Sequence, residues 1–237
     1  MQILLVTILN TKSRKIAFFD FCGTLVSFQT ADAFVDFARG VEGNFLMEFL
    51  NGCSIVLEKI KILQVLNKIF PDKSIEKKLK LLQLRGFTLE KLDDLAQRYY
   101  NVMIKPRVIK PVIEEMNTLR ENNYEVCIVS AGYSIYLKYF AEEYTIKDFI
   151  STEIAFNNST NICKGTISRK DCIYTEKIRR IKEYYEDQNI DYKECVSYSD
   201  SLIDLPLLLL SGTAVVISRS KPQDWCSQYK FKEIIWE

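Results

Sequence analysis

The chain has 237 residues, of which 48% are hydrophobic and 12% are aromatic, so it can bury a sizeable core and is not a disordered protein. A formal charge of +1 is too small to favour nucleic acid as a partner. Because the sequence contains no histidine, Ser-His catalysis, Cys-His catalysis and most zinc sites are excluded.

The cysteines and the N-terminal segment indicate the cellular compartment in which we expect the protein. The seven cysteines form no CxxC pair, and their odd number argues against a closed disulfide framework, so we expect a reducing, cytoplasmic setting. Residues 1–9 are mostly apolar, but this run is about half of the ~20 residues that a spanning helix needs. We therefore expect no stable membrane insertion. An extra edge strand or a start-site extension explains the run, and a weak membrane contact is the alternative.

Short apolar runs alternate with longer amphipathic segments, which is typical of a parallel sheet covered by helices. We expect strands at residues 15–20, 125–130, 149–154, 194–198 and 214–218. Residues 30–103 contain no convincing strand and repeat apolar residues at helical spacing, so they predict a helical insert. Its expected helices are residues 31–39, 44–69, 75–84 and 88–102.

The second half of the chain adds three further expectations. Pro111 is placed to begin a helix over residues 112–122. Alternating residues around an Asn/Ser/Thr cluster predict a β-hairpin between residues 154 and 177. The C-terminal segment FKEIIWE predicts a last edge strand. The chain thus reads as an α/β protein with a mostly parallel sheet.

The first candidate for chemistry is Asp20, which closes the apolar run KIAFFD. Gly23 permits a tight turn directly after it, and Thr24 offers a hydroxyl and a backbone N–H. Ligands of α/β sheets bind beyond the carboxyl ends of the strands, so this segment would lie at the binding edge. The alternative is that Asp20 only caps a turn.

Three other segments would reach the same edge. The run EVCIVS ends in Ser130, and Ala131 and Gly132 leave their N–H groups open to a phosphate; the alternative is that Ser130 caps the next helix. Asp200 and Asp204, after the predicted strand 194–198, could hold a hard cation or cap a helix. Lys177 could bring a fixed positive charge, although lysines of such helices usually face solvent.

Taken in order, these segments resemble the four motifs of the haloacid dehalogenase-like phosphatase superfamily, and most closely its phosphoserine-phosphatase-like branch, over residues 15–218. The resemblance implies a Rossmann-like core of residues 1–27 and 105–237 with an inserted helical cap of residues 28–104. It implies that Asp20 is the nucleophile and forms an aspartyl-phosphate, while Ser130 and Lys177 bind the phosphoryl oxygens.

The resemblance also implies a Mg²⁺ cofactor. Asp20, Asp200 and the backbone carbonyl of Cys22 would bind the ion, and Asp204 would ligate it directly or help to hold it and to orient Lys177. The phosphate-binding set would include Gly23, Thr24, Ser130, Ala131, Gly132 and Lys177.

The sequence departs from the family pattern at Cys22, where the family usually carries a second aspartate that donates a proton to the leaving alcohol and later activates water. A thiol with an ordinary pKa near ~8.5 is a poorly matched donor. We therefore expect slow turnover, transfer of the phosphoryl group to an acceptor other than water, or binding without turnover. Ser199 also replaces the usual glycine before the metal aspartate, which we expect to be tolerated.

We expect a Mg²⁺-dependent phosphatase or other phosphotransferase acting on a small phosphorylated metabolite. Gln29, Asp32 and Arg39 are candidate substrate contacts, and surface exposure explains them equally well. The alternative is a non-catalytic phosphate-binding or partner-binding protein with the same fold. A kinase or pump domain is disfavoured because no Walker-type loop is present. Dimerisation through the helical insert stays open.

Overall fold

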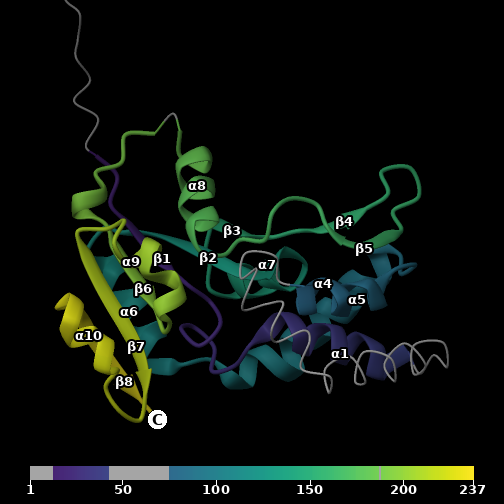
Figure 1. The fold of residues 1–237 in the computed structure, drawn as a ribbon, viewed down its shortest axis with the longest axis horizontal. Helices are drawn as coiled ribbons and strands as arrows, with labels where there is room; N and C mark the ends of the chain where they lie inside the picture. Colours follow the sequence, from purple (N-terminus) through teal and green to yellow (C-terminus); the bar gives the residue numbers. More distant parts are fainter. Residues whose placement is uncertain (1–12, 43–74, 187) are drawn as a thin grey trace, which may run out of the picture.

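A parallel six-stranded sheet lies in the left part of the protein in Figure 1, and helices extend from it to the right. This computed structural model describes residues 13–42, 75–186 and 188–237. The strand order is β3-β2-β1-β6-β7-β8, and every neighbouring pair is parallel. The strands are β1 (Ile16–Phe19), β2 (Glu125–Tyr133), β3 (Asp148–Thr152), β6 (Val196–Ser199), β7 (Thr213–Arg219) and β8 (Lys232–Trp236). The predicted α/β fold and the C-terminal edge strand are confirmed.

The strand predicted over residues 149–154 is confirmed as far as Thr152, but its predicted end is wrong. The chain forms β3 up to Thr152, and Ile154 then begins a second strand, β4 (Ile154–Phe156), which pairs antiparallel with β5 (Cys163–Ile167) in a separate sheet. The hairpin predicted between residues 154 and 177 is therefore confirmed, and it begins at Ile154. Thr152 and Ile154 are buried on either side of the exposed Glu153, so the alternation continues although the strand changes its partner.

Helices cover both faces of the sheet. They include α6 (Lys110–Glu121), α8 (Thr175–Tyr184), α9 (Leu205–Leu208) and α10 (Asp224–Tyr229). Successive side chains of a strand point to opposite faces, so Ala17 and Phe19 of β1 pack with α6, whereas Ile16 and Phe18 pack with α8 and α9. The prediction of a helix opened by Pro111 is confirmed in α6, which carries proline in its first turn.

Between β1 and α6, the described residues form helices that are joined by turns and isolated β-bridges, and they form no strand. Its elements are α1 (Thr30–Glu42), α4 (Ile75–Leu81), a 3-10 turn (Leu82–Leu84), α5 (Leu89–Tyr99), a π turn (Tyr100–Ile104) and a 3-10 turn (Lys105–Arg107). They match the predicted helices 31–39, 75–84 and 88–102. The predicted helix 44–69 lies outside the described residues.

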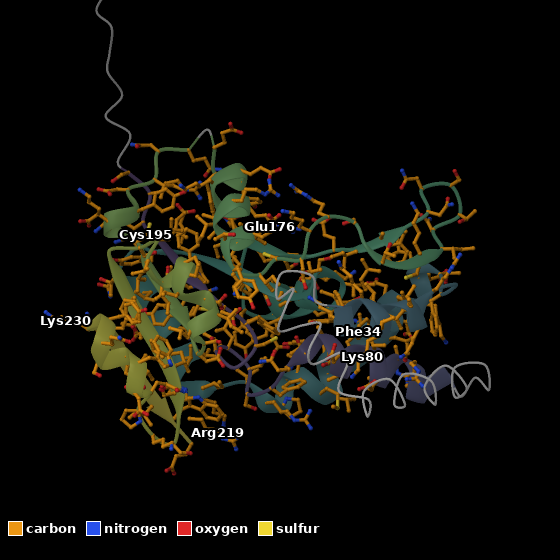
Figure 2. All side chains as sticks on the ribbon, viewed as in Figure 1. Phe34, Lys80, Glu176, Cys195, Arg219 and Lys230 are labelled. Atoms are coloured by element: carbon orange, nitrogen blue, oxygen red, sulfur yellow. The ribbon has the colours of Figure 1, made fainter. Side chains whose placement is uncertain are left out.

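The helices of this insert pack against one another and against α7 (Ser134–Glu143) beside the sheet (Figure 1). Phe34 of α1, labelled in Figure 2, lies 5.4 Å from the ring of Tyr99 and 5.3 Å from that of Tyr136, measured between ring centroids. These aromatic contacts join the insert to the core through α7. No described helix is long and apolar enough to cross a membrane.

The β4–β5 hairpin belongs to the second half of the sequence but lies against the helical insert (Figure 1). The N–H of Gly86 donates to the carbonyl of Cys163 at 3.0 Å, and the N–H of Cys163 donates to the carbonyl of Phe87 at 2.8 Å. Gly165 has a φ of +70°, and a Cβ there would lie 3.0 Å from the Cα of Leu82. Glycine thus permits the close approach, which joins the insert to the core at a second place. The division at residues 28 and 104 stays a prediction.

Candidate active site

Three neighbouring strands end at one edge of the sheet and bring the candidate residues together. Asp20 follows β1, Ser130 lies near the end of β2, and Asp200 follows β6. β1 lies between the other two strands in the sheet. Far-apart segments of the chain therefore meet at the carboxyl edge, as the alternating sequence pattern predicted.

Lys177 joins two of the carboxylates. Its Nζ lies 2.6 Å from Oδ1 of Asp20 and 2.6 Å from Oδ2 of Asp204. Its side chain is only 2% exposed, which excludes the solvent-facing alternative. Burial alone would lower the pKa of Lys177, but the two carboxylates hold it above its ordinary value, so the ammonium stays charged.

Asp204 is the most firmly held of these carboxylates. Its Oδ2 also accepts a hydrogen bond from the hydroxyl of Ser199 at 2.9 Å. The Ser199 hydroxyl in turn accepts from the N–H of Ser201 at 3.3 Å. Ser199, which replaces the glycine that the family resemblance led us to expect, thus orients Asp204 and through it Lys177.

The turn after Asp20 positions Asp200. Gly23 has a φ of +78°, and a Cβ added there would clash with Oδ2 of Asp200. The N–H of Asp200 donates to the hydroxyl of Thr24 at 3.0 Å. Asp200 does not cap the following turn, because the hydroxyl of Ser201 accepts the hydrogen bond from Ile203. The phosphate-binding roles of Gly23 and Thr24 stay predictions. In this structure their N–H groups donate to the carbonyls of Val26 and Phe21, and the hydroxyl of Thr24 accepts from Asp200.

The segment after Ser130 remains extended instead of starting a helix. β2 continues to Tyr133 with an irregular register after Ser130, and α7 begins at Ser134 without a side-chain cap. The alternative that Ser130 caps this helix is therefore wrong. The hydroxyl of Ser130 instead accepts from the N–H of Gly132 at 2.9 Å.

Cys22 lies between the predicted nucleophile and the helical insert. Its Sγ is 3.1 Å from the hydroxyl of Thr30, the first residue of α1, and that hydroxyl lies 2.7 Å from the hydroxyl of Tyr136. Burial, together with the charge of Asp20, raises the pKa of the Cys22 thiol to about 11. The thiol is therefore protonated at neutral pH and offers no base.

A cavity of about 170 Å³ opens among these residues. It is lined by Asp20, Cys22, Gln29, Ser130, Ala131, Ile173, Lys177, Asp200, Ser201, Ile203 and Asp204. At about 30 Å³ per water molecule, the space suits a phosphoryl group with a few further atoms. Larger hollows of 260, 330 and 510 Å³ lie elsewhere, but none is lined by Asp20, Lys177 or Asp200.

The residues that line the cavity agree with some of the predicted substrate contacts and not with others. Of the three candidate substrate contacts in the insert, Gln29 borders the cavity, whereas Asp32 and Arg39 are not among its lining residues. Sequence reasoning did not single out Ile173 or Ile203. These two aliphatic side chains carry no chemical signal of their own, and only their positions beside Lys177 and Asp204 bring them to the cavity.

The negative charge of the site suits a divalent cation. Burial raises the pKa of Asp20, and the neighbouring carboxylates raise it further, although the charge of Lys177 opposes them. Burial also raises the pKa of Asp200, and the negative charge of Asp204 adds to that shift. Three carboxylates therefore face one ammonium, and a hard cation would relieve their mutual repulsion.

The ligand set would nevertheless be small. Within the described residues, no group of three or more Asp, Glu, Cys or His side chains is placed to hold a metal ion. Asp204 is already paired with Lys177 and Ser199. The residues therefore fit Mg²⁺ through Asp20 and Asp200, with a backbone carbonyl and water as the remaining ligands, which is how Mg²⁺ is usually bound.

Residues 17–209 match the family model of haloacid dehalogenase-like hydrolases. No curated protein sequence matches the chain. A structure of a protein of unknown function from Bordetella pertussis Tohama I is 16% identical with a TM-score of 0.76, covering 94% of this chain and 99% of that one.

Two further solved structures share the fold. A HAD family hydrolase from Salmonella enterica subsp. enterica serovar Typhi is 16% identical with a TM-score of 0.62, covering 94% of this chain and 67% of that one. A phospho-aspartyl intermediate analogue of phosphoserine phosphatase is 16% identical with a TM-score of 0.61, covering 95% of each chain. The family match spans most of the chain, and the chain belongs to the haloacid dehalogenase-like hydrolase family, with a fold like that of phosphoserine phosphatase.

Proposed function

We propose that the protein is a Mg²⁺-dependent phosphoric monoester hydrolase that acts on a small phosphorylated metabolite through a phosphorylated Asp20. The observation that carries this proposal is the buried contact of Lys177 with Asp20 and Asp204, all three of which line a small cavity. Asp200 and Ser130 line the same cavity from the neighbouring strands.

Asp20 would attack the phosphorus atom. Lys177 donates a hydrogen bond to Oδ1 of Asp20, so the second carboxylate oxygen is left to form the new O–P bond. As this bond forms, the bond between phosphorus and the leaving oxygen breaks, and the leaving oxygen keeps the electron pair. The ammonium of Lys177 and the hydroxyl of Ser130 would contact the phosphoryl oxygens as negative charge shifts between them. Bound Mg²⁺ supplies further charge neutralisation at the phosphoryl group. Water would then hydrolyse the acyl phosphate and regenerate Asp20.

Cys22 limits this reaction. A protonated thiol with a pKa of about 11 neither matches an alkoxide leaving group well nor removes a proton from water. General acid–base help contributes typically about 10²–10⁴-fold. We therefore propose slow turnover, with hydrolysis of the phosphoenzyme as the step that suffers most.

The size and lining of the cavity support a small substrate. About 170 Å³ leaves room for a phosphoryl group and a few further atoms, and among the described residues of the insert it is Gln29 that lines the cavity. The cysteines within the described residues are all free, which suits the reducing, cytoplasmic setting that we propose. The proposal includes no nucleic-acid partner, and it is compatible with dimerisation through the insert.

The direct test is hydrolysis of p-nitrophenyl phosphate by the purified chain with Mg²⁺. We expect a measurable rate for the wild type, loss of that rate in Asp20→Asn and after chelation of Mg²⁺, and a wild-type rate in the control Asp94→Asn. Asp94 is a suitable control because its side chain is 58% exposed. Equal background rates for wild type and Asp20→Asn would favour the alternative, a phosphate-binding protein without turnover, which calorimetry with inorganic phosphate would then test.

A further inference from the structure

A lysine of the helical insert reaches into the core beside the candidate site. Lys77 lies on α4, and its Nζ is 2.5 Å from the carbonyl oxygen of Ala131 and 2.6 Å from Oδ1 of Asp171. The same Nζ lies 5.1 Å from the centroid of the Tyr133 ring. Its side chain is 15% exposed. The ammonium is thus surrounded by three groups of the core, although its own helix belongs to the insert.

The carboxylate that receives Lys77 is fixed from the opposite side. Oδ1 of Asp171 also accepts a hydrogen bond at 2.6 Å from the hydroxyl of Thr152, at the end of β3. That hydroxyl accepts in turn from the N–H of Cys172 at 3.0 Å. The Asp171 side chain is 5% exposed, so removal of Lys77 would leave a buried carboxylate without its cation. Such a loss is costly in a protein interior.

The two core groups bound by Lys77 belong to two walls of the cavity. Ala131 lines the cavity and follows Ser130, the predicted phosphate-binding hydroxyl. Asp171 begins the short segment that carries Ile173, another lining residue, into α8, where Lys177 lies. One ammonium from the insert therefore ties together the segments that present Ser130 and Lys177.

The geometry points to Lys77 as a positioning residue that couples docking of the insert to the arrangement of the phosphate-binding walls. We call Lys77, Asp171, Thr152 and the carbonyl of Ala131 the clasp. When α4 is docked, the clasp holds the carbonyl of Ala131 and thereby the extended segment from Ser130 to Tyr133. When α4 moves away, Asp171 loses its cation and the segment loses a restraint. The effect of the clasp on catalysis rests on the proposed function, whereas the docking itself does not.

Four variants test the clasp: Lys77→Met, Lys77→Arg, Asp171→Asn and the double variant of Lys77→Met with Asp171→Asn. Lys78→Met is the matched control, because Lys78 is the next residue on α4 and is exposed. Hydrogen exchange by mass spectrometry would follow α4 and residues 130–133, without ligand and with Mg²⁺ and beryllium fluoride as a phosphoryl mimic. Steady-state hydrolysis of p-nitrophenyl phosphate would give kcat and KM separately.

We expect Lys77→Met to speed exchange in α4 and in residues 130–133, and to raise KM roughly tenfold or more with a smaller change in kcat. Lys77→Arg keeps a cation beside Asp171 and should retain most of the wild-type behaviour. Lys77→Met should add little loss to Asp171→Asn, because both changes break the same contact. If Lys77→Met does not fold, Asp171→Asn carries the same comparison.

Two results would overturn the inference. One is exchange and KM in Lys77→Met that match those of Lys78→Met while the wild type hydrolyses the substrate. The other is full additivity of Lys77→Met and Asp171→Asn. A wild type that neither hydrolyses the substrate nor responds to beryllium fluoride would contradict the proposed function instead, and the exchange comparison without ligand would still decide whether the clasp exists.

Discussion

Replacement of Cys22 by aspartate should convert a slow phosphatase into a faster one. In the structure the Cys22 sulfur lies 3.1 Å from the hydroxyl of Thr30, and the N–H of Thr30 donates to it at 3.5 Å. A carboxylate at this position would find the same two donors at the start of α1. They would orient it toward the cavity that it shares with Asp20.

The expected magnitude follows from the protonation of the thiol. With a pKa of about 11, roughly one Cys22 thiol in 10⁴ is ionised at neutral pH, so its contribution as a base is close to nil. A positioned carboxylate supplies the missing general acid–base help, typically about 10²–10⁴-fold. The added negative charge beside Asp20 works against part of this gain, so we expect an increase near ~10²-fold.

The assay separates the two chemical steps. With p-nitrophenyl phosphate, whose leaving group needs little protonation, the wild type should release a burst of nitrophenol that approaches one equivalent of enzyme before a slow steady rate. Cys22→Asp should lose the burst and raise the steady rate, and Cys22→Asn, which has a similar shape but no acid or base, should behave like the wild type. If Cys22→Asp is no faster than Cys22→Asn, the reasoning from the thiol is refuted.

Two further predictions concern the residues that hold the site. Lys177→Met should destabilise the protein by about 3–5 kcal/mol in urea denaturation at neutral pH, because it leaves Asp20 and Asp204 buried without their cation. The exposed Lys182→Met on the same helix should have little effect, and equal stability of the two variants would contradict the ion-pair account. Gly23→Ala should abolish activity, since its Cβ would meet the Asp200 carboxylate. Gly86→Ala, at a φ of +94° with open space around it, should cost stability but retain activity; equal activities would argue against the role of Gly23.

The sequence predicts the meeting of the strand ends because parallel topology follows from a local pattern. Each apolar run marks a strand, each amphipathic segment marks a helix, and the ends of neighbouring parallel strands share one edge. Asp20 and Asp200 could therefore be placed at the same edge although they are 180 positions apart in the sequence. Residues whose position relative to a strand end is fixed by the chain itself are predictable in this way.

Contacts between two elements that are not joined by a pattern could not be predicted. Lys77 and Asp171 are 94 positions apart, and nothing in the helix of the first or the loop of the second indicates the other. The same holds for the hairpin, in which Gly165 lies against Leu82 of the insert. Such contacts depend on how the insert docks on the core, which is decided by shape and burial of side chains from many segments at once.

The end of β3 before Glu153 could not be predicted for a different reason. A period of two shows that residues lie in an extended chain, but it does not say which strand they pair with. Thr152 pairs within the large sheet and Ile154 with the hairpin, although both side chains continue one alternation. The partner changes where β3 reaches the end of the large sheet, and that limit is a property of the whole fold.

Whether Asp20 accepts the phosphoryl group can be tested by detecting that group directly. Wild-type protein mixed with p-nitrophenyl phosphate and Mg²⁺ and quenched in acid during the burst should carry one phosphoryl group, which peptide mass spectrometry should locate on Asp20 and hydroxylamine should remove. Hydrolysis of the substrate without phosphorylated Asp20, or a phosphoryl group on another residue, would show that Asp20 is not the nucleophile.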